Sequence, residues 1–82
     1  MTTIAPAFDQ PSTWIEMLQA IQERQQRTDE RPGQAAFNAV ALAWPEVAQV
    51  VGNTIGADPF YAEKDNDPRM IKFIELVRGY FI

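Results

Sequence analysis

Four carboxylates lie within the ten residues 58–67, at spacings that suit oxygen ligands of a calcium ion. They are Asp58, Glu63, Asp65 and Asp67. The calcium-binding helix–loop–helix pattern also requires a glycine at its sixth position and a glutamate at its twelfth. Counted from Asp58 these positions hold Glu63 and Arg69, and a count from Asp65 fails as well. We therefore predict no metal site, and expect these acids either to pair with Arg69 and Lys72 or to meet a basic partner protein.

A second group of polar side chains interrupts an alanine-rich segment. Arg31, Gln34 and Asn38 recur at three- and four-residue spacing, so on a helix they form one polar stripe. Two amides and a guanidinium near a helix N-terminus can bind a carboxylate, a phosphate or the backbone of a partner. The alternatives are that the stripe is a plain solvent-exposed face, or that Asn38 satisfies buried backbone of the segment 53–66.

Phe60 and Tyr61 place two large aromatic side chains directly after an Asp-Pro pair. Aromatic residues in a long connection usually anchor it to the core, whereas an exposed Tyr61 is typical of a protein-binding hot spot.

The chain also ends in the apolar residues Tyr80, Phe81 and Ile82. These close the core or meet a second copy of the chain, and the sequence leaves both possibilities open.

The sequence disfavours most enzyme chemistry. The chain has no cysteine and no histidine, which removes disulfides, thiolate nucleophiles, the usual zinc ligands and the commonest proton carrier near neutral pH. Phosphate-loop, dinucleotide and nucleophile-elbow motifs are missing as well. A carboxylate pair can hydrolyse a glycosidic bond, but this needs a sugar-sized cleft that a few short helices rarely enclose. We therefore predict a protein that is not an enzyme and uses no cofactor.

Length and composition indicate a single small domain. The chain has 82 residues, of which 46% are hydrophobic and 22% charged, with a net charge of −4. No apolar run approaches the roughly 18 residues that span a bilayer, so we expect a soluble cytoplasmic protein without a membrane partner. The net negative charge disfavours nucleic-acid binding, although Arg69, Lys72 and Arg78 make the last segment locally basic.

The positions of helix-starting residues predict an all-α bundle of three main helices plus a short one. Residues 1–12 read as a flexible arm and 13–82 as one helical domain. Thr13 and Glu16 fit a capping box at the start of the first helix, whose apolar face continues to about residue 22. The second helix begins near Pro32 and runs to about Trp44, and its many alanines predict a central position with neighbours on nearly every side.

The second half of the chain carries two further helix starts and a long connection. Pro45 opens a short third helix with a predicted buried edge of Val47, Val50 and Val51, ended by a left-handed stop at residues 52–53. The Asp-Pro pair at 58–59 predicts a single turn of helix, carrying Phe60 and Tyr61, in the long loop that follows. A second Asp-Pro pair at 67–68 starts the last helix. Its predicted apolar face consists of Met70, Ile71, Phe73, Ile74, Val77 and Phe81.

Residues 31–40, the Pro-Glu-Val-Ala run at 45–48 and the Asp-Pro-Phe-Tyr run at 58–61 carry a resemblance. The pattern of Arg, any residue and Gly-Gln, followed by Phe-Asn, resembles a group of small uncharacterised proteins from phages, prophages and bacteria. This resemblance implies a compact helical accessory protein. The chain departs from the group in its longer N-terminal arm and at residues 64–67, so a function located there does not carry over.

These observations predict a non-enzymatic, protein-binding accessory or inhibitor-type protein, encoded by a phage or prophage, that acts on a host or viral protein. Two alternatives remain: a nucleic-acid-linked role, as a DNA mimic or through weak contacts of the last helix, and a structural homo-oligomer. The candidate protein-binding residues are Arg31, Gln34, Asn38, Asp58, Tyr61, Glu63, Asp65 and Asp67.

Overall fold

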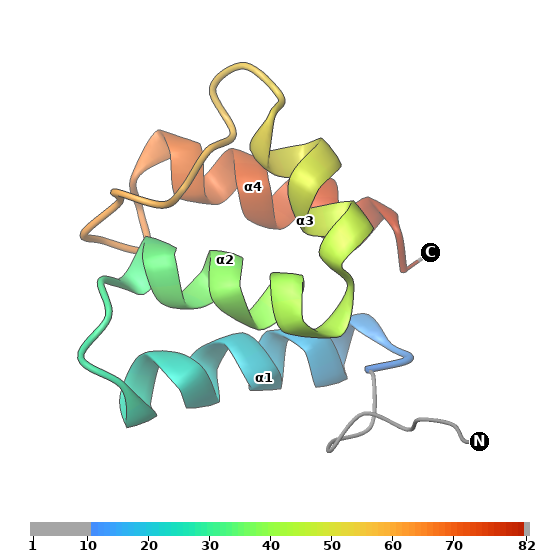
Figure 1. Ribbon diagram of the computed structural model, residues 1–82, viewed down its shortest axis with the longest axis horizontal. Helices are drawn as coiled ribbons and strands as arrows, with labels where there is room; N and C mark the ends of the chain where they lie inside the picture. The colour runs from blue at the N-terminus through green and yellow to red at the C-terminus, as the bar shows by residue number, and fades with distance from the viewer. Residues whose placement is uncertain (1–10, 82) are drawn as a thin grey trace.

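The computed structural model of the chain describes residues 11–81, and within them it contains four helices and no strand. The helices are α1 (Trp14–Arg27), α2 (Pro32–Ala43), α3 (Pro45–Gly52) and α4 (Pro68–Gly79), as Figure 1 shows. The all-α bundle with a long loop before the last helix is therefore confirmed. Residues 1–10, which form most of the predicted arm, and Ile82 lie outside the described residues.

Helix α1 begins where the capping chemistry predicts. The Thr13 side-chain oxygen accepts a hydrogen bond from the amide of Glu16 at 3.2 Å, and the Glu16 carboxylate reaches back to the amide of Ser12 at 2.8 Å. The reciprocal pair thus closes on Ser12 instead of on the capping residue itself. Pro11 is buried, and Ser12 is hydrogen-bonded to Glu16 of α1. Both residues belong to the segment 1–12 that the sequence predicts to be a flexible arm.

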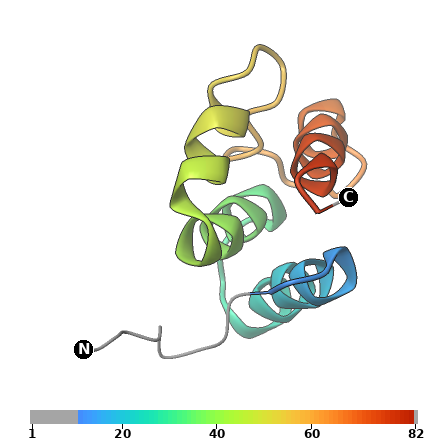
Figure 2. The ribbon, with the colours of Figure 1, turned by 90° about the vertical axis from the view of Figure 1, so that its right-hand side faces the viewer.

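Helix α2 lies between α1 and α3, and its alanines let those neighbours approach closely (Figure 2). Helix α4 packs against α3 and covers the remaining side of the core, where Phe73 is fully buried. The other members of the core are mostly small or flexible side chains: Met17, Ile21, Ala36, Ala39, Val40, Ala43, Ala48, Val51, Ala57, Ala62, Met70 and Val77. One side of α2 stays open, because Leu42 is exposed.

The predicted buried faces are wrong at two positions. Val50 is 58% exposed, because Ala48 and Val51 face the core from α3 and Val50 lies about 100° round the helix from Val51. Ile71 of α4 is 46% exposed, whereas Met70 and Phe73 beside it are buried. In both cases only a narrow stripe of the helix faces its neighbours. Not every residue of a continuous apolar run is therefore buried.

The predicted left-handed stop of α3 is also wrong. Asn53 ends the helix with a φ of −87°, and among residues 11–81 only Gly56 has a positive φ, of 80°. Gly52 is required for a different reason. A Cβ at this position would lie 2.9 Å from the ring of Phe37, so the missing side chain lets α3 lie against that ring.

The long connection between α3 and α4 is anchored to α2 through buried small residues. The amide of Gly33 donates to the carbonyl of Ala62 at 3.0 Å, and Ala57, Pro59 and Ala62 are buried. The Asp58–Pro59 pair forms a hydrogen-bonded turn, in which the Ala62 amide donates to the Pro59 carbonyl at 2.8 Å. The sequence predicts a turn at this place but predicts it to be helical, and the turn that forms is not helical.

The second Asp-Pro pair behaves as predicted. The Asp67 carboxylate accepts a hydrogen bond from the amide of Arg69 at 2.8 Å and caps α4, with Pro68 in the first turn. None of the helices in the described part of the chain combines the length and apolar character needed to cross a bilayer.

Candidate functional site

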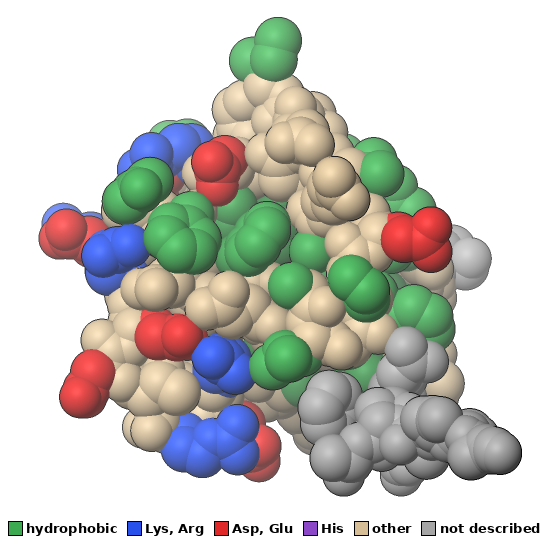
Figure 3. All heavy atoms as spheres, viewed as in Figure 1, with side chains coloured by type: hydrophobic (Ala, Val, Ile, Leu, Met, Phe, Trp, Pro, Cys, Tyr) green, Lys and Arg blue, Asp and Glu red, His purple; other side chains and the backbone are tan. Residues whose placement is uncertain are grey.

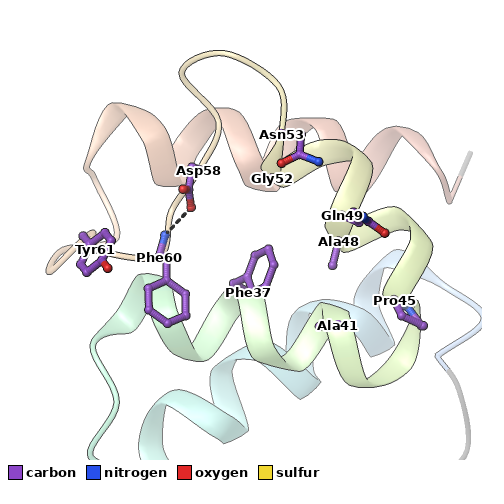
Figure 4. A pocket seen from close by; sticks show the side chains of 10 residues that line it. All are labelled: Phe37, Ala41, Pro45, Ala48, Gln49, Gly52, Asn53, Asp58, Phe60 and Tyr61. Carbon is purple, nitrogen blue, oxygen red and sulfur yellow. Dashed lines mark hydrogen bonds between the residues drawn. The ribbon is translucent and has the colours of Figure 1, made fainter.

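A shallow groove of about 500 Å³ lies between α2, α3 and the connection that follows α3 (Figure 4). It crosses from Pro45, at the start of α3, to Tyr61, in the turn after Pro59. The ten side chains that line it are Phe37, Ala41, Pro45, Ala48, Gln49, Gly52, Asn53, Asp58, Phe60 and Tyr61. Its volume is in the range of small-molecule and short-peptide sites.

Aromatic rings form one end of the groove and are fixed from below. Phe37 and Phe60 pack edge to face with ring centroids 6.1 Å apart, and Phe37 also lies 6.0 Å from the buried Phe73. Tyr61 packs edge to face against Phe60 at 5.3 Å and is 66% exposed. Phe37 is therefore held by the core, Phe60 packs on Phe37, and Tyr61 packs on Phe60 with most of its surface open to a ligand.

Small residues of α3 keep the opposite wall of the groove low. Ala48 and Gly52 bring the backbone of α3 close to Phe37, and Figure 4 shows Gln49 and Asn53 extending from the same helix at the rim. Gln49 and Asn53 are both exposed. The rim therefore offers two side-chain amides, each able to donate and accept hydrogen bonds.

Asp58 supplies the only charge among the lining residues. Its Oδ1 accepts a hydrogen bond from the amide of Phe60 at 3.1 Å, which fixes the turn, and the side chain is exposed. Its Oδ2 makes no hydrogen bond within residues 11–81. One lone carboxylate oxygen thus remains available beside the aromatic rings.

The structure separates the members of the predicted polar stripe. The Arg31 guanidinium lies over the rings of Phe60 and Tyr61, 5.6 Å and 5.0 Å from their centroids, and its Nε donates to the Phe60 carbonyl at 3.4 Å. Asn38 donates to the Glu30 carboxylate at 3.0 Å instead. Gln34 is half-buried between them. Arg31 therefore supports the aromatic end of the groove, whereas Asn38 contributes to the connection between α1 and α2.

Glu30 is the centre of that connection. Its carboxylate takes two hydrogen bonds from Arg24, at 2.8 and 3.0 Å, and further ones from Asn38 and Thr28. The hydrogen bonds from Arg24, followed by that from Asn38, hold the pKa of Glu30 below its ordinary value. The same pairing raises the pKa of Arg24. This network fixes the turn between α1 and α2 and does not face the groove.

The four acids of the connection do not gather at one place. Asp67 pairs with Arg69 at 3.0 Å, and this hydrogen bond, with the one from the Arg69 amide, lowers the pKa of Asp67. Asp65 accepts from the Gln25 side chain of α1 at 3.0 Å, Glu63 is exposed, and Asp58 lies in the groove. Across residues 11–81 no three acidic, histidine or cysteine side chains are grouped so as to hold a metal ion.

The predicted pairing of the acids with Arg69 and Lys72 is thus found for Asp67 and Arg69. Lys72 makes no ion pair within residues 11–81.

At the end of the described chain, Phe81 packs against Trp14 of α1 with ring centroids 6.1 Å apart, and Tyr80 is exposed. Phe81 therefore helps to close the core, and Tyr80 stays on the surface.

Sequence reasoning did not identify Phe37, Gln49, Gly52 and Asn53 as parts of a site. One sequence feature points to this site. Phe37 is a single bulky aromatic residue in an alanine-rich helix, and a glycine, Gly52, follows in the next helix. Figure 3 shows the result on the surface, where hydrophobic side chains gather over α2 and the turn after Pro59.

No protein-family model, no curated protein and no solved structure matches the chain.

Proposed function

We propose that this chain is a non-enzymatic, protein-binding protein of the accessory or inhibitor type, encoded by a phage or prophage, and that it holds a segment of a host or viral protein in the groove. The observation that carries the proposal is the set of three packed rings, Phe37, Phe60 and Tyr61, fixed by the core and open on one side. Rigid aromatic surface loses little conformational entropy on binding and is enriched at protein interfaces.

The mixture of groups in the groove also favours a peptide ligand. Apolar surface lies next to two amides and one carboxylate, so side chains and backbone of a peptide find partners together. Catalysis has no comparable support, because the described residues that line the groove include a single carboxylate and no histidine, cysteine, serine, threonine or lysine.

The proposed phage or prophage origin rests only on the resemblance of residues 31–61 to small phage and prophage proteins. All ten lining residues lie within residues 31–61, the part of the chain that resembles small phage and prophage proteins. The nucleic-acid alternative has less support, because the carboxylate of Asp67 already pairs with Arg69 in the basic segment.

A displayed library of random peptides tests the proposal. We expect the wild-type chain to select peptides that shift the backbone NMR signals of groove residues. Asn53→Arg and Gln49→Arg put a bulky charged side chain at the rim and should weaken the selected peptides on the order of tenfold, about 1.4 kcal/mol. Both positions are exposed, so the fold should tolerate the change.

Gln19→Arg is the matched control, since Gln19 is exposed on α1 and does not line the groove. It should bind the selected peptides as the wild type does. Failure to select any peptide, or equal affinity for Asn53→Arg, Gln49→Arg and wild type, contradicts binding in the groove.

A further inference from the structure

We infer that the ligand of the groove is a short peptide segment in which an arginine neighbours a bulky apolar residue, with the guanidinium paired to Asp58. This inference rests on the proposed function and specifies its ligand. The apolar residue would cover the rings of Phe37 and Phe60, and the arginine would extend along the rim toward the turn.

The charges around the groove favour a cationic ligand. Among the described residues Asp58 is the only charged one that lines it, and its Oδ2 makes no hydrogen bond or close ion pair within residues 11–81, although its charge also acts on the guanidinium of Arg69. The chain as a whole has a net charge of −4, which also disfavours a second copy of itself as the occupant. A cationic group of a ligand beside Asp58 would pair with this carboxylate and would offset part of the net negative charge of the chain.

The rings next to Asp58 favour a guanidinium over an ammonium group. Phe60 and Tyr61 already hold the guanidinium of Arg31 at 5.6 and 5.0 Å, which shows that their surfaces suit a planar cation. Arg31 is not among the residues that line the groove, and it makes no ion pair with Asp58 within residues 11–81. A guanidinium stacks on aromatic rings and pairs with a carboxylate in a fixed planar geometry, which an ammonium group does not do.

Three pools of capped pentapeptides test the inference. Each has the form acetyl-Ala-X-Z-Z-Ala-amide, in which Z is leucine, isoleucine, phenylalanine or tryptophan. The residue X is arginine in one pool, its uncharged analogue citrulline in the second and glutamate in the third. Affinity is measured by NMR titration of the amide signals of the groove residues, at low salt so that surface charge is weakly screened.

We expect the arginine pool to bind wild-type protein about two- to fivefold more tightly than the citrulline pool, as for one exposed ion pair. The glutamate pool should bind more weakly still. In Asp58→Asn, whose amide oxygen can still accept from the Phe60 amide, the arginine and citrulline pools should bind equally. Asp29→Asn makes the same charge change at an exposed position outside the groove and should keep the wild-type difference.

The results separate this inference from the proposed function. Binding of all three pools in the groove with equal affinity would falsify the preference for arginine and leave peptide binding intact. An arginine preference that persists in Asp58→Asn overturns the role of Asp58. If no pool shifts the groove signals, the inference fails, and selection from the random library then decides the proposed function by itself.

Discussion

The amide of Gly33 donates a hydrogen bond to the carbonyl oxygen of Ala62 at 3.0 Å, and this contact joins the first turn of α2 to the connection that forms one wall of the groove. The approach is close because Gly33 has no side chain. A Cβ at this position would lie 1.8 Å from the carbonyl oxygen of Pro59 and 2.8 Å from the Cβ of Ala62. The groove therefore depends on a backbone-to-backbone contact that only glycine permits.

Gly33→Ala should be strongly destabilising. The new methyl group would meet backbone, which cannot rotate aside, so α2 and the turn at Pro59 would have to separate. We expect a loss of about 2–3 kcal/mol in the free energy of unfolding, measured by urea denaturation. Gly79→Ala is the matched control, because nothing lies within 4 Å of the new Cβ on α4, and it should stabilise by about 0.5 kcal/mol. Equal stabilities of the two variants would contradict the contact.

Phe73→Ala should remove most of the stability of the domain. Phe73 is fully buried and supports Phe37, so its loss leaves a cavity beneath the groove. The expected cost is about 3–5 kcal/mol, a large share of the total for a domain of this size. Ile55→Ala, at a position that is 91% exposed, should change the free energy of unfolding by less than about 0.5 kcal/mol. A loss below about 1 kcal/mol for Phe73→Ala would mean that the core lies elsewhere.

The helix starts could be predicted from sequence because their chemistry is local. The Thr13 hydroxyl accepts from the Glu16 amide, and the Asp67 carboxylate accepts from the Arg69 amide, so both partners lie within four residues along the chain. The same is true of the turn at Asp58 and Pro59, although its helical or non-helical form depends on contacts with α2. A short window of sequence thus contains both partners of each interaction, and fold class follows from these starts together with the apolar spacing.

The exposed and buried sides of α3 and α4 could not be predicted in the same way. Whether Val50 or Ala48 faces the core depends on how α3 lies against α2, and at that contact the ring of Phe37 lies close to Gly52. The groove arises from the same distant contact. The sequence could therefore suggest single binding residues but not which of them lie together. Of the eight candidates, only Asp58 and Tyr61 line the groove.

Acid should destabilise the chain through Glu30. Its folded-state pKa is lowered by Arg24 and then by Asn38, so the folded state binds protons less readily than the unfolded chain. The resulting stability is fully present above the ordinary glutamate pKa of about 4.3 and is lost as the pH falls through the lower folded value. Glu30→Gln should be less stable than wild type at pH 7, and the difference should shrink toward pH 3. Glu75→Gln, at an exposed position on α4, is the control for loss of a carboxylate. A Glu30→Gln difference that stays constant between pH 7 and pH 3 counts against the ion pair.

Arg31→Gln should loosen the aromatic end of the groove without unfolding the domain. The guanidinium of Arg31 lies over two rings and donates to the Phe60 carbonyl, so its removal frees the turn at three points. We expect a loss of about 0.5–1 kcal/mol and faster hydrogen exchange at the amides of Ala62 and Gly33, which hold the turn closed. Arg27→Gln is the matched control, because within residues 11–81 Arg27 pairs only with Glu23, at 3.5 Å on the exposed side of α1. Unchanged exchange at Ala62 in Arg31→Gln would show that the rings are held by Phe37 and the backbone alone, and Arg31 would then be free to contact a partner directly.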